Sequence, residues 1–396
     1  MRLLHVIRSL DPAGGGPIEV VRQFAALHRR EGHEVQIASL DLPGTAYLPE
    51  LDVPKHLLGN SERNYGASSE LIPWIQKHAP ALDAVIVHGL WQFHGRAVRD
   101  ALLGSSTPYY VYPHGMLDPW FKRAYPLKHF KKAVYWRLVE HRVLRDARAV
   151  LYTCEEERQL GRTTFQPYQC TEQIAPLGIE EPGGNREEQR TAFLEAFPQL
   201  REKRLILFLG RVHDKKGCDL LIRAFGQSLG QTPEFHLAIA GPCADPSYLT
   251  LLTELAREAC PAGRVHFLPM LSGDVKWGAF HASEAFALPS HQENFGIAVA
   301  EALACGLPVL ISNKVNIWRE IEQDGAGYVE ADTLAGTGEL LARWARNSPA
   351  ELSEMRAAAR RCFQARFEVE AAADALLAVL QEGAGRVPEL SNVTRS

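Results

Sequence analysis

Residues 290–308 read SHQENFGIAVAEALACGLP, and they are the part of the chain that says most about its architecture. An apolar run, Glu284–Leu288, precedes them, and a second run, Pro308–Ser312, overlaps their end. A strand, an apolar helix and another strand in this order predict a βαβ unit with parallel strands. Glu293 falls in the loop after the first strand, and Glu301 falls one to two turns into the helix. The spacing therefore predicts two carboxylates near the carboxyl end of a buried strand.

The same alternation of apolar runs and amphipathic segments extends in both directions, which predicts two doubly wound α/β domains. A polar passage with glycine and proline, Leu177–Asn185, interrupts it and is the predicted linker. Because 396 residues exceed the usual size of one domain, we expect domains over 1–180 and 181–365, followed by a terminal segment, 366–396. If the two sheets face each other, ligands would bind in the cleft between them. The predicted strands are Leu3–Arg8, Glu34–Ser39, Ala84–Val87, Tyr109–Tyr112 and Ala149–Tyr152 before the linker, and Leu205–Leu209, His236–Ala240, Val265–Leu268, Glu284–Leu288 and Pro308–Ser312 after it.

The composition argues against several classes of protein. The formal net charge is -4, whereas a generic nucleic-acid binder is normally basic, so we expect no nucleic-acid partner. Seven cysteines without a Cys-x-x-Cys pair favour a reducing compartment over a disulfide framework. No run of about 18 apolar residues occurs, which predicts that no helix crosses a membrane. The expected location is the cytoplasm.

Two loops that follow predicted strands are suited to binding a diphosphate. Gly15 and Gly16 lie in a glycine run that opens a helix, where the backbone can approach an anion, although a plain strand-to-helix turn has the same pattern. In residues 210–217, Arg211 offers a planar fork for phosphate oxygens and Lys216 adds a mobile charge. A solvated basic loop is the alternative interpretation. The position directly after a buried strand favours phosphate binding.

Hydroxyl groups of a sugar or a ribose are the ligands expected at Glu293 and Glu301, because a carboxylate accepts hydrogen bonds from vicinal hydroxyls. The start of the intervening helix would present backbone N–H groups to the same ligand. These N–H groups belong to Asn294, Phe295, Gly296 and Ile297.

His114 follows the predicted strand Tyr109–Tyr112 and precedes a glycine. It could contact a substrate hydroxyl or donate a proton, and a satisfied core histidine is the alternative. His88, before Gly89, is a weaker candidate in a similar place. The chain has no Asp-x-Asp pair, no His-Glu-x-x-His motif and no Cys/His cluster, so we expect neither a metal nor another cofactor.

In chain order, the glycine loop, His114, the 210–217 loop and the Glu-x7-Glu element resemble the family 4 retaining glycosyltransferases. That family has the GT-B fold, two Rossmann-like doubly wound domains facing across a cleft. The Glu-x7-Glu element is the most specific part, and residues 113–120 and 316–320 resemble a branch associated with bacterial exopolysaccharide and surface-glycan assembly. The resemblance implies metal-independent transfer of a hexose from a nucleotide-sugar donor, GDP-mannose or a UDP-hexose, to a glycan or lipid-linked acceptor. The anomeric configuration of the sugar would be retained.

The resemblance also implies a role for each site residue. Glu301 would bind the ribose of the donor, Glu293 would hold the transferred sugar, and His114 would contact that sugar near its reacting carbon. The residues that would stabilise the departing diphosphate are Arg211, Lys216, Gly15 and Gly16.

Two further expectations come from the resemblance. The backbone of Leu271 would contact the base, with Lys276 near it, although many family members have a glycine where this chain has Pro269. The final helix would return to pack on the first domain, and Phe367–Leu380 has the apolar spacing that such a helix requires.

Residues 121–148 contain nine Lys/Arg and two acids, interleaved with aromatic residues. Phe130, Val134 and Leu138 recur at helical spacing, which predicts a basic amphipathic helix or pair of helices. One interpretation is a helix that turns its apolar side to the core and its basic side to solvent. The other is docking on an anionic membrane that carries a lipid-linked acceptor, which would make the protein peripheral at the inner face of the cell membrane.

Three other functions are alternatives to transfer. A nicotinamide-dependent oxidoreductase would need the G-x-G-x-x-G fingerprint, which is missing. A sugar-nucleotide epimerase shares the architecture, and it would isomerise its substrate without an acceptor. A non-catalytic nucleotide-sugar-binding protein would show no turnover.

Overall fold

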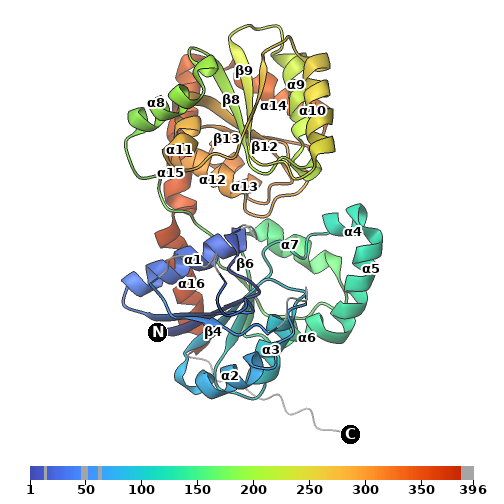
Figure 1. Cartoon of the computed structure of the whole chain (residues 1–396), viewed down its shortest axis with the longest axis vertical. Helices are drawn as coiled ribbons and strands as arrows, with labels where there is room; N and C mark the ends of the chain where they lie inside the picture. Colours follow the sequence, from blue (N-terminus) through green and yellow to red (C-terminus); the bar gives the residue numbers. More distant parts are fainter. Residues whose placement is uncertain (13–15, 46–51, 61–64, 385–396) are drawn as a thin grey trace. The chain divides into compact units, whose positions relative to one another are not determined.

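The computed structural model describes residues 1–12, 16–45, 52–60 and 65–384 (Figure 1). They form two compact units. The first unit contains Met1–Gly178 together with the chain from Val369 onward, and the second contains Ile179–Glu368. The chain therefore leaves the first unit once and returns to it once.

The first unit is built on a seven-stranded parallel sheet with the order β3-β2-β1-β4-β5-β6-β7. Its central strands are apolar at nearly every position, as expected for strands covered by helices on both faces. The order reverses between β1 and β4, where Ile7 pairs with His88, and ligands of doubly wound sheets generally bind at such a reversal. The strands are β1 (Arg2–Ile7), β2 (Glu34–Ser39), β3 (Lys55–Leu57), β4 (Ala84–His88), β5 (Tyr109–Tyr112), β6 (Ala149–Tyr152) and β7 (Glu172–Ile174).

Amphipathic helices cover this sheet. In α1, Pro17 lies in the first turn, where its fixed φ suits a helix start, and Phe24 is buried. The segment after β5 forms a run of short helices that includes η3, a π-helical turn. The helices of the first unit are α1 (Gly16–Arg30), α2 (Leu71–His78), η2 (Ala79–Ala81), α3 (Phe93–Leu102), α4 (Trp120–Ala124), α5 (Pro126–Tyr135), η3 (Trp136–Glu140), α6 (His141–Asp146), α7 (Glu155–Thr164) and α16 (Val369–Ala384).

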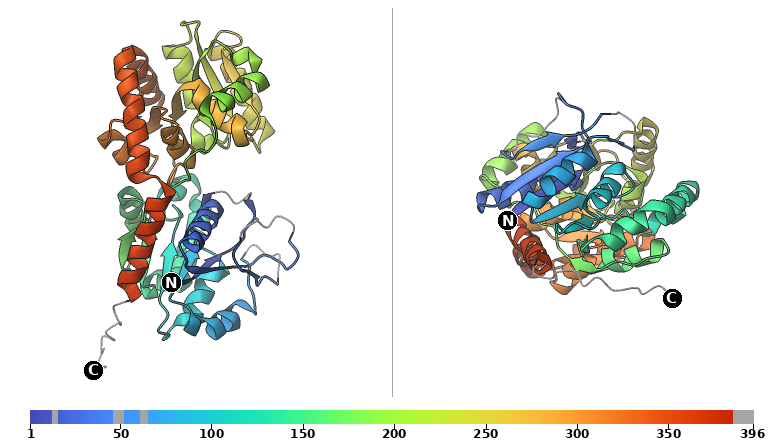
Figure 2. Two further views of the ribbon diagram at one scale, coloured as in Figure 1. Left: turned by 90° about the vertical axis from the view of Figure 1, so that its left-hand side faces the viewer. Right: turned by 90° about the horizontal axis from the view of Figure 1, so that it is seen from below.

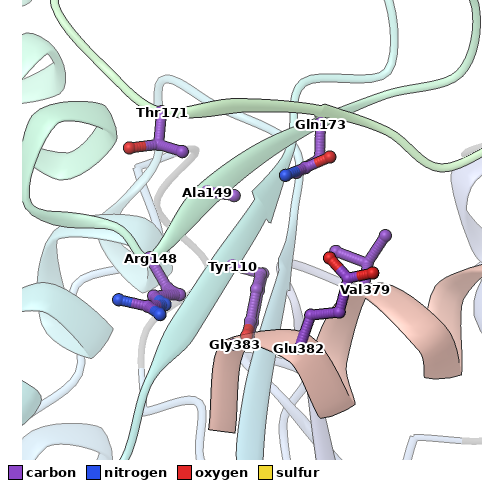
Figure 3. A pocket seen from close by; sticks show the side chains of 8 residues that line it. All are labelled: Tyr110, Arg148, Ala149, Thr171, Gln173, Val379, Glu382 and Gly383. Carbon is purple, nitrogen blue, oxygen red and sulfur yellow. The ribbon is translucent and has the colours of Figure 1, made fainter. Parts of the chain in front are cut away.

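The last helix, α16, packs beside α1 in the first unit (Figure 2). The Nε2 atom of His28 on α1 lies 3.2 Å from the carbonyl oxygen of Ala373. At the end of α16 the chain runs so close to Tyr110 that a Cβ atom on Gly383 would lie 1.8 Å from the tyrosine hydroxyl. A pocket remains at this junction, where Arg148, Tyr110 and Glu382 line it together with residues of β6 and β7 (Figure 3).

The second unit has a six-stranded parallel sheet with the order β10-β9-β8-β11-β12-β13, and its order reverses between β8 and β11. The strands are β8 (Arg204–Leu209), β9 (Phe235–Ala240), β10 (Val265–Leu268), β11 (Ser283–Leu288), β12 (Val309–Ser312) and β13 (Gly327–Glu330). The helices are α8 (Arg186–Ala196), η4 (Pro198–Leu200), η5 (Asp214–Lys216), α9 (Cys218–Ser228), α10 (Pro246–Ala259), α11 (Gly273–Ala282), α12 (Ile297–Ala304), α13 (Trp318–Gln323), α14 (Leu334–Arg346) and α15 (Pro349–Arg366).

The prediction of two parallel α/β domains is confirmed, and all ten predicted strands are present within one or two residues of their expected ends. Three strands were not predicted, and all three lie at sheet edges: β3, β7 and β13. The units divide after Gly178 and after Glu368, where the expected boundaries were 180/181 and 365/366. No helix in the described part of the chain is both long and apolar enough to span a membrane.

The prediction that the apolar side of residues 121–148 turns to the core is wrong for α5. None of the residues of α5 is buried, and Leu127 and Phe130 are 81% and 70% exposed. Val134, and Leu138 on η3, are also exposed. The buried core residues of this segment follow α5 instead, among them Trp136, Val143 and Leu144.

Candidate functional site

The basic loop 210–217 and the carboxylate loop 290–296 lie side by side in the second unit, because they follow the adjacent strands β8 and β11. The backbone N–H of His291 donates to the carbonyl oxygen of Lys215 at 2.8 Å, and the hydroxyl of Ser290 donates to the same oxygen at 3.0 Å. In return, Nζ of Lys215 donates to Oε1 of Gln292 at 2.8 Å. The two loops predicted to bind a diphosphate and a sugar are thus held together by hydrogen bonds.

Gly217 allows the two loops to approach this closely. Its φ is +68°, in the left-handed region that side chains with a Cβ disfavour. A Cβ atom on Gly217 would also lie 2.3 Å from the carbonyl oxygen of Pro289, which no side chain can tolerate. Arg211 lies earlier in the same loop and is exposed.

Lys216 and Glu293 form an ion pair at this junction. Their side chains are only 13% and 19% exposed, so the pair is largely shielded from solvent. The backbone of Glu293 is fixed on both sides, because its N–H donates to Lys314 O at 2.9 Å and its carbonyl oxygen accepts from Asn316 N–H at 3.0 Å. The predicted sugar-binding carboxylate and the predicted phosphate-binding lysine are therefore in direct contact.

Burial lowers the pKa of Lys216 to about 7, and the nearby charges of Lys215 and Arg211 act in the same direction. The carboxylate of Glu293 acts in the opposite direction, because an ionised partner favours the ammonium form. An anionic ligand that reached Lys216 would likewise favour the charged amine.

Glu301 is the fifth residue of α12, and its side chain is 12% exposed. It forms an ion pair with Lys276 of α11, with 2.8 Å between Nζ and Oε1. The family resemblance places Lys276 only near the base, whereas the structure gives it a direct contact with the predicted ribose-binding residue. Leu271, two residues before α11, is buried with 8% exposure.

The residues between the two carboxylates form a tight turn into α12. Gly296 has φ +74° and is the N-cap of that helix. Phe295 is buried, and the side chain of Asn316 donates to Oδ1 of Asn294 at 3.3 Å. Ile297 begins the helix, so first-turn N–H groups lie next to Glu293.

In the first unit, His114 follows β5 and has φ +51°, which is uncommon for a residue with a side chain. Its Nε2 atom lies 3.0 Å from Nδ1 of His88, and Nε2 of His88 lies 2.9 Å from Nδ1 of His5. Burial lowers the pKa of His114 to about 3. The ring is therefore neutral near pH 7, which suits a hydrogen-bond contact better than delivery of a proton from an imidazolium.

Glu157 on α7 holds the backbone beside His114, and sequence reasoning did not find it. One carboxylate oxygen accepts from Gly115 N–H at 2.6 Å. The other accepts from the N–H and the hydroxyl of Thr153 at 2.7 and 2.8 Å. Its side chain is buried, with 3% exposure. An acid in the first turn of a helix is common enough that its sequence position carried no signal.

In the second unit the structure joins Lys216 to Glu293 and Lys276 to Glu301. Gly16 begins α1 at the order reversal of the first sheet, and Gly15 lies outside the described residues. Among the residues that the structure describes, no group of three His, Cys, Asp or Glu side chains could hold a metal ion.

Comparison with known proteins gives matches in both units. Residues 15–169 match the family model "Glycosyl transferase 4-like domain", and residues 190–361 match "Glycosyl transferases group 1". Sucrose-phosphate synthase from Thermosynechococcus elongatus has a similar structure, with a TM-score of 0.75 and 20% identity over 96% of this chain and 99% of that one. Anabaena Alr3699/HepE in complex with UDP has a TM-score of 0.78 and 16% identity over 96% and 100%.

These folds place the chain in the class of GT-B proteins, with two Rossmann-like domains. Within that class, the chain belongs to the group 1 glycosyltransferases with a family 4-like N-terminal domain. A D-inositol 3-phosphate glycosyltransferase from Rhodococcus opacus is 31% identical over 173 residues, which cover 42% of this chain and 38% of the relative. The matched segment thus spans well under half the length of that curated relative.

Proposed function

We propose that the chain is a retaining, metal-independent hexosyltransferase of polysaccharide biosynthesis that uses a nucleotide sugar as donor. The observation that carries this proposal is the joining of loops 210–217 and 290–296, in which Lys216 contacts Glu293. Cations suited to a diphosphate and carboxylates suited to sugar hydroxyls lie together at the order reversal of a parallel sheet. The structurally similar Anabaena Alr3699/HepE forms a complex with UDP, which supports a nucleotide-sugar donor here, either a UDP-hexose or GDP-mannose.

In the proposed reaction, the bond between the anomeric carbon and the diphosphate oxygen breaks, and its electron pair leaves with the diphosphate. The acceptor hydroxyl attacks the anomeric carbon from the same face, and its proton passes to the departing phosphate oxygen. Lys216 and Arg211 meet the negative charge as it develops, while Glu293 and His114 hold the sugar. Loss of one preorganised contact of this kind costs about 3–4 kcal/mol in the barrier.

Donor binding tests the proposal most directly. Titration calorimetry with UDP-glucose and with GDP-mannose, each in EDTA, should show that one of them binds the wild-type protein. Glu301→Gln should abolish or strongly weaken that binding, because a neutral amide replaces the carboxylate proposed to hold the ribose. Glu284→Gln is the matched control, because Glu284 pairs with Arg204 at 2.8 Å near the amino ends of the same strands β8 and β11.

The outcomes separate the proposed transferase from its alternatives. Binding only in the presence of a divalent metal would contradict metal independence. Isomerised nucleotide sugar in a reaction without acceptor would identify an epimerase. Binding without hydrolysis, and without transfer to any of a panel of glycan and lipid-linked acceptors, would favour a non-catalytic binding protein.

The exposed side of α5 supports a second element of the proposal, docking on an anionic membrane that carries a lipid-linked acceptor. Leu127, Phe130 and Val134 share one face of the helix and are 81%, 70% and 48% exposed. Lys128 and Lys131 are exposed on the same helix. Apolar side chains flanked by lysines are the composition of helices that lie in the interface of an anionic bilayer.

Vesicle co-sedimentation tests this docking. The wild-type protein should sediment with vesicles that contain phosphatidylglycerol, and much less with phosphatidylcholine alone. The double variant Leu127→Ser, Phe130→Ser should lose the binding. Leu103→Ser is a matched control, because Leu103 is 64% exposed in the same unit but lies at the end of α3 rather than on α5. Binding that does not depend on lipid charge, or that is unchanged in the double variant, would refute docking through this helix.

A further inference from the structure

Three histidines form a hydrogen-bonded row across the first sheet. Nδ1 of His5 on β1 lies 2.9 Å from Nε2 of His88 at the end of β4, and Nδ1 of His88 lies 3.0 Å from Nε2 of His114. The rings are stacked in sequence, with centroids 5.2 and 5.3 Å apart. His5 and His88 are buried, with 0% and 2% exposure. The row thus connects the middle of the sheet to His114, in the loop after β5.

Neutral rings restrict such a row to two arrangements, because each of its two hydrogen bonds needs one N–H donor and one bare nitrogen acceptor. In the first arrangement, Nδ1–H of His5 donates to His88, Nδ1–H of His88 donates to His114, and His114 carries its own proton on Nδ1. In the second arrangement every bond is reversed, and Nδ1 of His114 is a bare acceptor. The tautomer of His5 therefore sets the tautomer of His114.

The inner end of the row favours the first arrangement. Nε2 of His5 is buried and has no hydrogen-bond partner among the described residues. The second arrangement would place a proton on this atom and bury an N–H without an acceptor. The first arrangement leaves only an unpaired acceptor there, and buried N–H donors without partners are rarer than under-satisfied acceptors.

We propose that His5 and His88 are positioning residues that hold His114 as its Nδ1–H tautomer, so that His114 presents a hydrogen-bond donor to an oxygen of the donor sugar. The identity of the ligand rests on the proposed function, whereas the tautomer of His114 does not depend on it. Nε2 of His114 is engaged by His88, so Nδ1 is the ring nitrogen left for a ligand. A fixed N–H spares the site the cost of selecting a tautomer when the donor binds.

The tautomer can be measured without any substrate. Long-range ¹H–¹⁵N correlation spectra of protein labelled with ¹⁵N-histidine distinguish a protonated from a bare nitrogen in each ring. The His114 signals are assigned by their loss in His114→Ala. In the wild-type protein near pH 7, Nδ1 of His114 should be protonated and Nε2 bare. The opposite pattern, or an even mixture of both, would overturn the proposal whether or not the protein is a glycosyltransferase.

Variants of the row then test its consequence. His5→Asn places an amide donor where Nδ1 of His5 lies, so His114 should keep its tautomer and turnover should stay within a fewfold of wild type. His5→Leu removes that donor, so His114 should become a mixture of tautomers and kcat should fall about 10- to 100-fold with a smaller change in KM, as when other tautomer-fixing partners are lost.

His94 supplies the control for damage to the fold. It is equally buried, and its Nε2 atom lies 2.9 Å from the backbone carbonyl oxygen of His88, outside the row. His94→Leu should lower the free energy of unfolding and leave the tautomer of His114 unchanged. Equal losses of kcat in His5→Asn and His5→Leu, or an altered His114 tautomer in His94→Leu, would refute the role of the row. If no donor is turned over by the wild-type protein, the proposed function fails and the spectra still decide the tautomer.

Discussion

Raising the pH should weaken donor binding, because burial lowers the pKa of Lys216 to about 7. A bound diphosphate favours the ammonium form, so the pKa of Lys216 is higher in the complex than in the free protein. Its contribution to affinity is therefore fully present below pH 7 and is lost as the pH rises above it. At pH 8.5 only about 3% of free Lys216 would be protonated, which predicts an affinity roughly 30-fold weaker than at pH 6, or about 2 kcal/mol.

Calorimetry with an intact nucleotide sugar in EDTA at a series of pH values measures this loss, because a diphosphate diester does not titrate between pH 6 and 8.5. Lys216→Arg is the matched control, since a guanidinium stays charged throughout this range and should bind with nearly constant affinity. A wild-type affinity as flat as that of Lys216→Arg would refute the reasoning. It would mean that the ion pair with Glu293 outweighs burial and keeps the amine charged.

Three further substitutions test individual contacts. Gly217→Ala should destabilise the protein by about 2–4 kcal/mol in urea unfolding, because the new Cβ would lie 2.3 Å from Pro289 O, and an unchanged midpoint would contradict this. Glu157→Gln should lower stability by about 1.5–3 kcal/mol and lower kcat, because one amide oxygen cannot accept the hydrogen bonds from Gly115 and from both groups of Thr153. A kcat equal to that of the wild type would argue against a role of Glu157 in positioning the loop. Gly383→Ala should destabilise the protein by about 1–3 kcal/mol and lower its melting temperature, because the new Cβ would overpack the end of α16 against Tyr110. An unchanged melting temperature in scanning calorimetry would exclude that close contact.

All central strands could be predicted from the sequence, whereas of the four edge strands, β3, β7, β10 and β13, only β10 could. β4 is buried at every position and reads as a continuous apolar run, so its pattern is clear. β3 and β13 are partly exposed along their whole lengths, and β7 has only three residues. An edge strand of this kind owes its pairing to the neighbouring strand, and its own residues carry little hydrophobic signal.

The candidate site was predictable where its parts are close in sequence. Glu293 and Glu301 share one loop and helix, so their neighbourhood followed from spacing alone. The partners of these acids did not follow, because Lys216 is 77 residues from Glu293 and Lys276 is 25 residues from Glu301. Such pairs depend on the order of strands in the sheet, and hydrophobic periodicity does not encode that order.

The exposure of α5 shows a second limit of pattern reading. A helix with an apolar side and a basic side has the same sequence pattern whether the apolar side meets a core or is left uncovered. The core contacts of this segment come from residues after α5, such as Trp136, Val143 and Leu144, while Leu127 and Phe130 stay exposed. Only the three-dimensional packing could distinguish the two cases.

The return of the chain to the first unit at Val369 has a consequence for synthesis on the ribosome. The first 178 residues emerge before the second unit, yet their fold is completed by α16, which contacts them through His28 and Tyr110. At typical elongation rates the intervening segment of roughly 190 residues takes about 10–40 s to make. During that interval the nascent first unit lacks α16, whose Leu376 and Leu380 are buried in the finished protein, so the surface that α16 later covers is open to chaperones.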